Sequence, residues 1–305
     1  MIEEYNALLF YPVQYEGEEQ SLNVFYTAAS PNQQLVPAAK FAKEELGCSK
    51  FYLLGTDYVF PRTANKVLKA YLLKSGVPES NIMEEYTPFH HQDYQTIVGK
   101  IKKFAAGGDA CVLSTINGDS NVPFYTEFSS QGLTSDDCPI IAFSVAEDEL
   151  RAMDTSKLAG HLAAWNYFQS IDSEANNAFV KAFKDYCQRN NLPGGADRVT
   201  DDPIEAAYYG VKVWAKACEK AGSTDVDAVR QAVYGMEFDA PGGAKKMHAT
   251  NQHTYKPVYI GEIRTDGQFD IVWQSDGLVE PDSYSSLLWD GKEDQIPAPT
   301  GGPKK

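Results

Sequence analysis

The stretch Phe51-Tyr52-Leu53-Leu54-Gly55 is a short apolar run between the polar residues Lys50 and Thr56. A run of this length predicts a β-strand that is buried on both of its faces. Directly after it, apolar side chains recur at helical spacing between residues 64 and 72, and the pattern ends near Gly76. A buried strand that is followed at once by an amphipathic helix is the building unit of a parallel α/β sheet.

The same alternation of strand and helix extends from residue 24 to about residue 170. Further strands are predicted at residues 24–26, 83–86, 111–113 and 140–143, and further helices at 34–46, 97–104 and 125–128. Strands that are separated by helices pair in parallel, with helices on both faces of the sheet. The sequence therefore predicts an α/β fold that is built on doubly wound sheets.

A long helix is predicted after residue 201. It begins at Asp202-Pro203-Ile204-Glu205, where Asp202 is the predicted N-cap and proline takes the first helical position. Glu205 has the spacing of the glutamate in a capping box. The predicted apolar face of this helix carries Ala207, Val211, Trp214 and Cys218, and Gly222 ends it.

A hairpin and a tail complete the chain. Apolar residues alternate at 259–263 and again at 269–273, on either side of the turn pair Asp266-Gly267. This pattern predicts two antiparallel strands joined by a tight turn. The last residues are rich in Pro and Gly, so residues 286–305 are predicted to be a flexible tail.

Composition excludes several classes of protein. A chain of 305 residues is long enough for two packed lobes. The net charge is −15 and the basic residues are scattered, whereas nucleic-acid binding needs clustered ones, so no nucleic-acid partner is expected. No apolar run is long enough to cross a bilayer, so direct membrane insertion is not expected. The start Met1-Ile2-Glu3-Glu4 lacks the features of a signal peptide.

The cysteines are too far apart in the sequence for a metal motif. The chain has 5 of them, with no C-x-x-C pair. An odd number at wide spacing argues against a disulfide framework and against a structural zinc site. Free thiols are the predicted state of Cys48, Cys111, Cys138, Cys187 and Cys218.

Loops after three predicted strands are rich in polar and aromatic residues. They are residues 56–63, 117–121 and 144–147. The carboxyl ends of parallel strands meet at one edge of a sheet, and ligands bind there in open α/β folds, so we expect a ligand site at this edge. Taken singly, Asp57, Asp119 and Ser144 are also ordinary helix N-caps. Ser144 and Glu147 have the spacing of a capping box.

No catalytic motif is visible. The chain has no G-x-S-x-G nucleophile elbow and no H-E-x-x-H zinc motif. His90 and His91 with Asp93 suggest a metal site, but adjacent histidines in a polar loop rarely face one ion, and a solvated loop is favoured. Glu147 and Glu149 lie two residues apart on a predicted helix, so their carboxylates diverge. The sequence predicts no enzyme, no metal and no cofactor.

Several segments carry a family resemblance in their order along the chain. They are LFYPVQYEG at residues 9–17, GTDYVFPRTAN at 55–65, NGDSN at 117–121, AAWNYFQSID at 163–172, RVTDDP at 198–203 and FDAP at 238–241. These segments resemble urea-type substrate-binding proteins of ABC transporters, which belong to the type I periplasmic-binding-protein family. A sister branch of that family binds short aliphatic amides, but Phe60 and the 117–121 loop look like the urea branch.

The resemblance implies two doubly wound lobes, joined by hinge strands, that close on a ligand between them. The family's first lobe begins with βα units that have no counterpart here, so the first lobe is expected to be incomplete. Residues 1–31 and 165–235 would form the remnant of lobe 1, residues 32–164 and 236–285 lobe 2, and residues 286–305 a flexible tail. The resemblance also implies a periplasmic or cell-surface location and delivery of the ligand to permease subunits.

An incomplete first lobe has consequences for exposure and affinity. Part of the edge of the strand at residues 7–11 and the apolar face of the helix at 205–221 are expected to be exposed. The shortened chain is expected to bind urea at least tenfold more weakly than a complete protein, which corresponds to about 1.4 kcal/mol.

Urea offers one carbonyl acceptor and four N–H donors, so its site needs several acceptors and aromatic walls. The resemblance supports Tyr11 and Tyr58 as ligand contacts. Loop position adds Gln14, Asn117, Gly118, Asp119 and Glu147. Two other functions stay open: an amide-sensing regulator that signals to a protein partner, and an amidase-like enzyme, against which the missing nucleophile argues.

Overall fold

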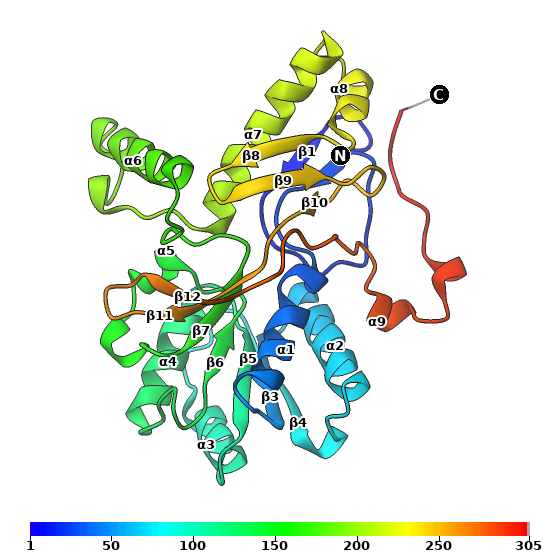
Figure 1. The fold of residues 1–305 in the computed structure, drawn as a ribbon. Helices are drawn as coiled ribbons and strands as arrows, with labels where there is room; N and C mark the ends of the chain where they lie inside the picture. Colours follow the sequence, from blue (N-terminus) through cyan, green and yellow to red (C-terminus); the bar gives the residue numbers. More distant parts are fainter. Residues whose placement is uncertain (304–305) are drawn as a thin grey trace. The chain divides into compact units, whose positions relative to one another are not determined.

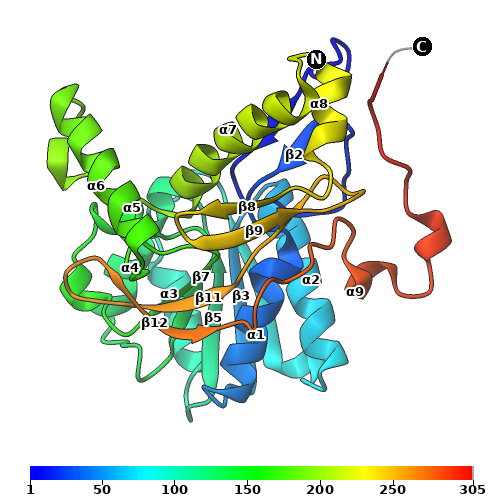
Figure 2. The same ribbon diagram turned by 45° about the horizontal axis from the view of Figure 1, so that its top comes forward.

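The computed structural model describes residues 1–303, and the chain divides into two compact units. Unit 1 comprises residues 1–33, 171–258 and 275–305, and unit 2 comprises residues 34–170 and 259–274. Figures 1 and 2 show the elements of each unit from two directions. No helix in the described part of the chain combines the length and the apolar character that crossing a membrane requires.

The sheet of unit 2 confirms the predicted parallel strands. Within residues 1–303 its strand order is β12-β11-β7-β6-β5-β3-β4. The parallel strands are β3 (Lys50–Thr56), β4 (Ile82–Thr87), β5 (Ala110–Thr115), β6 (Ile140–Ala142) and β7 (Leu162–Trp165). Beside β7, β11 (Tyr259–Ile263) and β12 (Phe269–Gln274) form the predicted antiparallel hairpin, which makes the sheet mixed.

Helices cover both faces of this sheet. They are α1 (Leu35–Glu44), α2 (Val59–Lys74), α3 (Gln95–Phe104), α4 (Asn121–Ser130) and the short α5 (Glu147–Leu150). Phe51 and Leu53 of β3 pack with α1 and α2, whereas Tyr52 and Leu54 pack with α3 and α4. Successive side chains of a strand point to opposite faces, so β3 contributes to both cores. The doubly wound arrangement is confirmed.

Gly55 allows α2 to begin close to the sheet. A Cβ atom at this position would lie 2.4 Å from Thr115 Oγ1 and 2.7 Å from Pro61 Cβ. Both distances are shorter than real Cβ contacts, so any larger residue would push the start of α2 away from β5. Glycine therefore sets the position of the loop at residues 57–58.

Unit 1 is built from helices around two small sheets. Its helices are α6 (Glu174–Arg189), α7 (Asp202–Ala221), α8 (Val226–Val233) and α9 (Ser286–Trp289). In the described residues, β1 (Leu9–Tyr11) pairs in parallel with β2 (Val24–Tyr26), and β10 (Thr254–Tyr255), β9 (Gly243–Met247) and β8 (Glu237–Ala240) form an antiparallel sheet. Among the described residues of both units, short 3₁₀ helices lie at Pro31–Gln33, Glu79–Asn81, Gly118–Ser120, Thr155–Lys157, Gly195–Asp197 and Glu293–Gln295.

The start of α7 differs from the prediction by one residue. Asp201, and not Asp202, is the N-cap, and its Oδ1 accepts a hydrogen bond from Ile204 N at 3.0 Å. Glu205 does not reach back to the cap, because its carboxylate is buried and accepts hydrogen bonds from Lys245 Nζ and Gly242 N, each at 2.9 Å. The predicted capping box is therefore wrong.

The buried stripe of α7 is also shifted from the predicted one. Its buried apolar residues are Ala206, Tyr209, Gly210, Val213 and Ala217. Val211 and Trp214 of the predicted apolar face are 67% and 42% exposed. Exposure of the predicted apolar face is what the resemblance led us to expect, and the helix packs through the neighbouring stripe.

The borders of the units differ from the borders predicted for the lobes. Residues 236–258 and 275–285, predicted as parts of lobe 2, belong to unit 1, and residues 165–170 belong to unit 2. The reason is that β8 and β9 pair with each other, while Phe238 and Met247 join the core around α7 and α8.

The predicted tail makes hydrogen bonds within unit 1. Thr300 O accepts from Leu22 N at 2.8 Å, and Gly302 N donates to Asn23 Oδ1 at 2.7 Å. These bonds hold residues that were expected to be flexible, whereas Lys304 and Lys305 lie outside the described residues.

Candidate functional site

The carboxyl edge of the unit 2 sheet carries most of the predicted site residues. Tyr58 follows β3, and Asn117, Gly118 and Asp119 follow β5. Glu147 opens α5 after β6. Because β3, β5 and β6 are neighbouring parallel strands, their loops emerge at the same edge, as predicted.

Aromatic rings line the first part of this edge. Tyr58 is the N-cap residue of α2, with an extended backbone at φ −156° and ψ −174°. Its ring centroid lies 4.8 Å from Phe89 and 6.4 Å from Phe60. Phe89 comes from the loop after β4 and is 53% exposed. We call Tyr58 and Phe89 the aromatic wall, because Phe60 is buried in the core beneath them. Phe89 was not among the predicted site residues, although its place in the loop after a predicted strand could have indicated a ligand contact.

Asp57 is not the N-cap of α2 that the sequence suggests. Its Oδ1 accepts a hydrogen bond from Arg62 Nε at 2.7 Å, and its backbone N donates to Thr87 O at 2.7 Å. The Arg62 guanidinium holds the pKa of Asp57 below its usual range. The same guanidinium lies 3.8 Å from the ring centroid of Tyr86. The charge of Arg62 is therefore already engaged.

The loop after β5 is held by backbone and side-chain hydrogen bonds. Asn117 N donates to Thr56 Oγ1 at 3.0 Å, and Asn117 Nδ2 donates to Thr115 O at 2.9 Å. Gly118 has φ +65°, a left-handed conformation that glycine adopts without strain. The N-cap position of α4 is Ser120 and not Asp119, so Asp119 is left to serve another partner.

That partner is His90. The Nδ1 atom of His90 lies 2.9 Å and 3.0 Å from the two carboxylate oxygens of Asp119. Both side chains are largely exposed. The exposure of His90 agrees with the predicted solvated loop. The prediction did not include the contact between His90 and Asp119, which joins the loops after β4 and β5.

Glu147 lies beneath the edge. It is completely buried, and its Oε1 accepts a hydrogen bond from Gln169 N at 2.6 Å. Glu149 Oε2, not Glu147, reaches back to the start of α5 and accepts from Ala146 N at 2.8 Å. The predicted capping box of Ser144 and Glu147 is therefore wrong. Glu147 instead ties the segment after β7 to the segment after β6.

Tyr11 and Gln14 belong to unit 1. Tyr11 ends β1 and lies opposite Tyr26 of β2. Burial, with further contributions from the carboxylates of Glu16 and Glu19, raises the pKa of Tyr11. Gln14 is half-buried in the segment that follows β1. These two predicted residues thus belong to unit 1, whereas the other predicted site residues belong to unit 2.

The described residues contain no group of three or more His, Cys, Asp and Glu side chains arranged to hold a metal ion. The five cysteines are free thiols, and four of them are buried.

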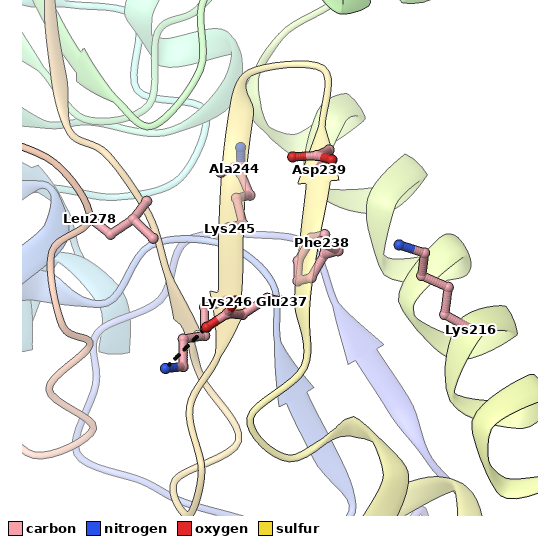
Figure 3. Close-up of a pocket in the computed structure, with 8 residues that line it drawn as sticks. All are labelled: Lys216, Glu237, Phe238, Asp239, Ala244, Lys245, Lys246 and Leu278. Atoms are coloured by element: carbon pink, nitrogen blue, oxygen red, sulfur yellow. Dashed lines mark ion pairs between the residues drawn. The ribbon is translucent and has the colours of Figure 1, made fainter.

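Unit 1 has a pocket along the β8–β9 hairpin. Its volume is about 490 Å³, and Lys216, Glu237, Lys245 and Lys246 are among its lining residues (Figure 3). Glu237 pairs with Lys246 at 3.5 Å, and Lys245 is engaged with the buried Glu205. Because three of these four charged side chains are already paired with other residues of the protein, this pocket is a weaker candidate than the edge of unit 2.

The fold is an α/β fold of the type I periplasmic-binding-protein class. Residues 1–289 match the model of the periplasmic binding protein domain family, and the chain belongs to this family.

Solved structures share this fold at low sequence identity. An amino acid ABC transporter substrate-binding protein from Pseudomonas fluorescens Pf-5 is 17% identical, with a TM-score of 0.74 over 92% of this chain and 74% of that chain. A leucine binding protein from Thermotoga maritima MSB8 is 16% identical, with a TM-score of 0.73 over 89% of this chain and 74% of that chain. A solute binding protein of an ABC transporter from Rhodopseudomonas palustris HaA2, in complex with p-hydroxybenzoic acid, is 23% identical. Its TM-score is 0.71 over 84% of this chain and 68% of that chain.

Curated relatives are longer than this chain. The Leu/Ile/Val-binding protein homolog 6 of Brucella melitensis biotype 1 is 26% identical over 244 residues, which are 79% of this chain and 59% of that protein. A protein of Geobacillus stearothermophilus named limonene hydroxylase is 30% identical over 146 residues, which are 47% of this chain and 25% of that protein. The family is one of binding proteins, and the match to the hydroxylase covers less than half of the chain.

Proposed function

We propose that this chain is the ligand-binding part of a solute-binding receptor for a small neutral amide, urea in particular. The observation that carries the proposal is that Arg62 and Asp119, at the carboxyl edge of unit 2, already have partners within the protein. Asp57 pairs with Arg62, and Asp119 pairs with His90. A ligand with a carboxylate, such as an amino acid or a benzoate, is best bound by a guanidinium whose N–H groups are free to donate hydrogen bonds to that carboxylate. Arg62 is not free, so this edge suits a neutral ligand.

The same edge offers what a flat amide needs. Tyr58 and Phe89 present ring faces against which a planar molecule can stack. Asn117 and Asp119 supply oxygen acceptors for N–H groups, and backbone groups of the loop around Gly118 supply both donors and acceptors. Leaving such an acceptor unpaired in the bound state costs about 1–3 kcal/mol, which favours ligands that carry the matching N–H groups. Tyr11 and Gln14 of unit 1 remain part of the proposed contact set.

Family membership supports a role in transport. Two of the similar solved proteins named above are binding proteins of ABC transporters. We propose by analogy that this receptor acts in the periplasm or at the cell surface and delivers its ligand to permease subunits of such a transporter. The chain spans 59% of a curated relative's length, so the roles of a complete protein are part of this proposal.

Calorimetry with a panel of ligands tests the proposal. Urea, acetamide and formamide represent neutral amides, whereas leucine and 4-hydroxybenzoate represent ligands with a carboxylate. We expect urea to bind more tightly than any other member of the panel. Leucine or 4-hydroxybenzoate binding at least as tightly would refute the assignment to neutral amides. Sustained release of ammonia from urea above a heat-killed control would show an enzyme instead.

A further inference from the structure

Unit 1 contains a pocket on one face of the β1–β2 pair. Leu9 lies opposite Val24, and Tyr11 lies opposite Tyr26, so these four side chains share one face of the pair. The segment at residues 15–19 borders the same space, which has a volume of about 210 Å³. We call this space the tyrosine pocket, and its polar lining residues are Tyr11, Tyr15, Tyr26, Glu16 and Glu19.

Aromatic rings form much of its lining. The rings of Tyr15 and Tyr26 stack, with centroids 4.7 Å apart and an angle of 20° between their planes. Tyr11 adds a third ring from the end of β1. The face of an aromatic ring is electron-rich and attracts cations, above all where water is partly excluded.

The hydroxyl protons of the two stacked rings are already used. His253 Nδ1 lies 2.5 Å from Asn251 O, and since a carbonyl can only accept, Nδ1 carries the proton. Burial lowers the pKa of His253 to about 3, so the ring is neutral and its Nε2 is an acceptor. Tyr15 OH donates to this Nε2 at 2.5 Å.

Tyr26 follows the same pattern. Its OH donates to Glu19 Oε1 at 2.7 Å. The hydroxyl oxygens of Tyr15 and Tyr26 can therefore accept further hydrogen bonds but not donate them. The two rings stack on each other, and the Tyr26 ring also stacks on His253 with centroids 4.2 Å apart, so among the described lining residues the ring of Tyr11 is the one left without a stacking partner in the pocket.

The carboxylates of the pocket have no cationic partner. Within residues 1–303, neither Glu16 nor Glu19 forms a salt bridge. Glu18 lies between them in sequence, but its carboxylate is used elsewhere, by Ser285 N at 2.9 Å and by Trp289 Nε1. Burial, together with the charge of Glu19, raises the pKa of Glu16. Two acidic side chains thus line an aromatic pocket that has no basic side chain among its lining residues.

We propose that the tyrosine pocket binds a small organic ammonium ion. The N–H groups of such an ion would donate to Glu16 and Glu19, and its carbon atoms would lie against the tyrosine rings. A neutral amide gains less here, because it brings no charge to offset the two carboxylates. Of the residues proposed to contact the amide, only Tyr11 also lines this pocket, and the proposal extends the proposed function without depending on it.

Methylammonium chloride is a suitable probe. We expect calorimetry of the 305-residue protein to show saturable binding of methylammonium, and sodium chloride at the same concentrations to show none. The double variant Glu16→Gln with Glu19→Gln should bind methylammonium at least tenfold more weakly. Its amide oxygens can still accept from Tyr26 OH, so the local structure should persist. Glu219→Gln, which removes an exposed carboxylate from α7 of the same unit, is the matched control and should bind as the wild type does.

Two results would overturn the proposal. One is the absence of saturable methylammonium binding by the wild-type protein. The other is an unchanged affinity in the double variant at an unchanged melting temperature. If the double variant does not fold, the single variant Glu16→Gln decides, because it leaves the hydrogen bond between Tyr26 and Glu19 in place, and an unchanged affinity there also overturns the proposal. Urea titrated in parallel tests the amide site separately, since Glu16 and Glu19 are not among its proposed contacts.

Discussion

Glu205 of α7 and Lys245 of β9 form an ion pair with 2.9 Å between Oε1 and Nζ, and their side chains are 1% and 0% exposed. Glu205 Oε1 also accepts a hydrogen bond from Gly242 N, in the turn between β8 and β9. One carboxylate thus joins the first turn of α7 to both the turn and the second strand of the hairpin. Removing one partner of such a pair leaves an uncompensated charge in the protein interior.

Replacing Glu205 by alanine should therefore lower the free energy of unfolding by about 3–5 kcal/mol, as measured with guanidinium chloride. The paired replacement Glu205→Leu with Lys245→Met should recover most of this loss, because it removes both charges. Glu237→Ala is the control: its pair with Lys246 on the same hairpin is exposed at 76% and 42%. We expect it to cost less than about 1 kcal/mol. Equal losses in Glu205→Ala and Glu237→Ala would contradict the importance of burial.

The packing register of α7 gives a second prediction. Val213 is completely buried against the unit 1 core, whereas Val211 is 67% exposed. Val213→Ala should lower the free energy of unfolding by about 2 kcal/mol, and Val211→Ala should change it by less than about 0.5 kcal/mol. The two variants remove the same atoms from the same helix, so chemical denaturation of both tests the register directly. A larger loss of stability for Val211→Ala than for Val213→Ala would show that the apolar stripe predicted from the sequence is the one that packs against the core.

Sequence patterns predict elements that bury a strong apolar run. β3 and β5 are short apolar segments between polar ones, and both were predicted close to their observed bounds. α6 was not predicted, because in its 16 residues it buries little besides Asn176, Phe179 and Cys187, which leaves no clear stripe. The register of α7 was missed for the opposite reason, since two neighbouring stripes of this helix are apolar and only tertiary packing distinguishes them.

In the candidate site, too, some features follow from the sequence and others depend on tertiary packing. Loop positions at the carboxyl ends of strands follow from topology, so the edge that carries Tyr58 and Asn117 was predictable. The pair between His90 and Asp119 was not, because these residues are 29 positions apart and meet through a loop in which His90 takes φ +60°. The burial of Glu147 depends likewise on the segment after β7 and not on its own neighbours in sequence.

Gly55 should be intolerant of even the smallest side chain. Gly55→Ala would place a Cβ atom 2.4 Å from Thr115 Oγ1, and relieving this overlap should cost about 1–3 kcal/mol. Gly99→Ala in α3 is the control, because the nearest atom to its added Cβ would be 3.9 Å away and alanine favours a helix. Thermal unfolding should show a lower melting temperature for Gly55→Ala and an equal or higher one for Gly99→Ala. A tolerated Gly55→Ala would mean that α2 can shift without loss.

His161 should make unit 2 sensitive to acid. Its Nδ1 accepts a hydrogen bond from Ile140 N at 3.1 Å, and burial lowers its pKa from 6.5 to about 4. Between these values the unfolded chain binds a proton that the folded chain does not, so the free energy of unfolding falls as pH falls through this window. The contribution lost should be about 3 kcal/mol at most. His161→Gln keeps an acceptor but does not titrate, so its stability should fall less between pH 6.5 and 4. Parallel slopes for the two proteins would show that His161 is not responsible.

The last prediction concerns the carboxylate that the proposed amide site shares with His90. His90 Nδ1 lies within 3.0 Å of both oxygens of Asp119, so a urea molecule must share or displace this contact to donate to the same carboxylate. Asp119→Ala removes the acceptor and should weaken urea binding at least tenfold, about 1.4 kcal/mol. His90→Ala removes the competitor, so the affinity for urea should stay equal or increase.

Calorimetry on these two variants distinguishes a ligand contact from a loop-stabilising pair. If the pair served only to hold the two loops, both replacements would break it and both would weaken binding to the same extent. Asp57→Ala is the control at the same edge, because the Asp57 carboxylate is held by Arg62 and should contribute little to the ligand. Opposite effects of Asp119→Ala and His90→Ala, with Asp57→Ala unchanged, would therefore identify Asp119 as the acceptor.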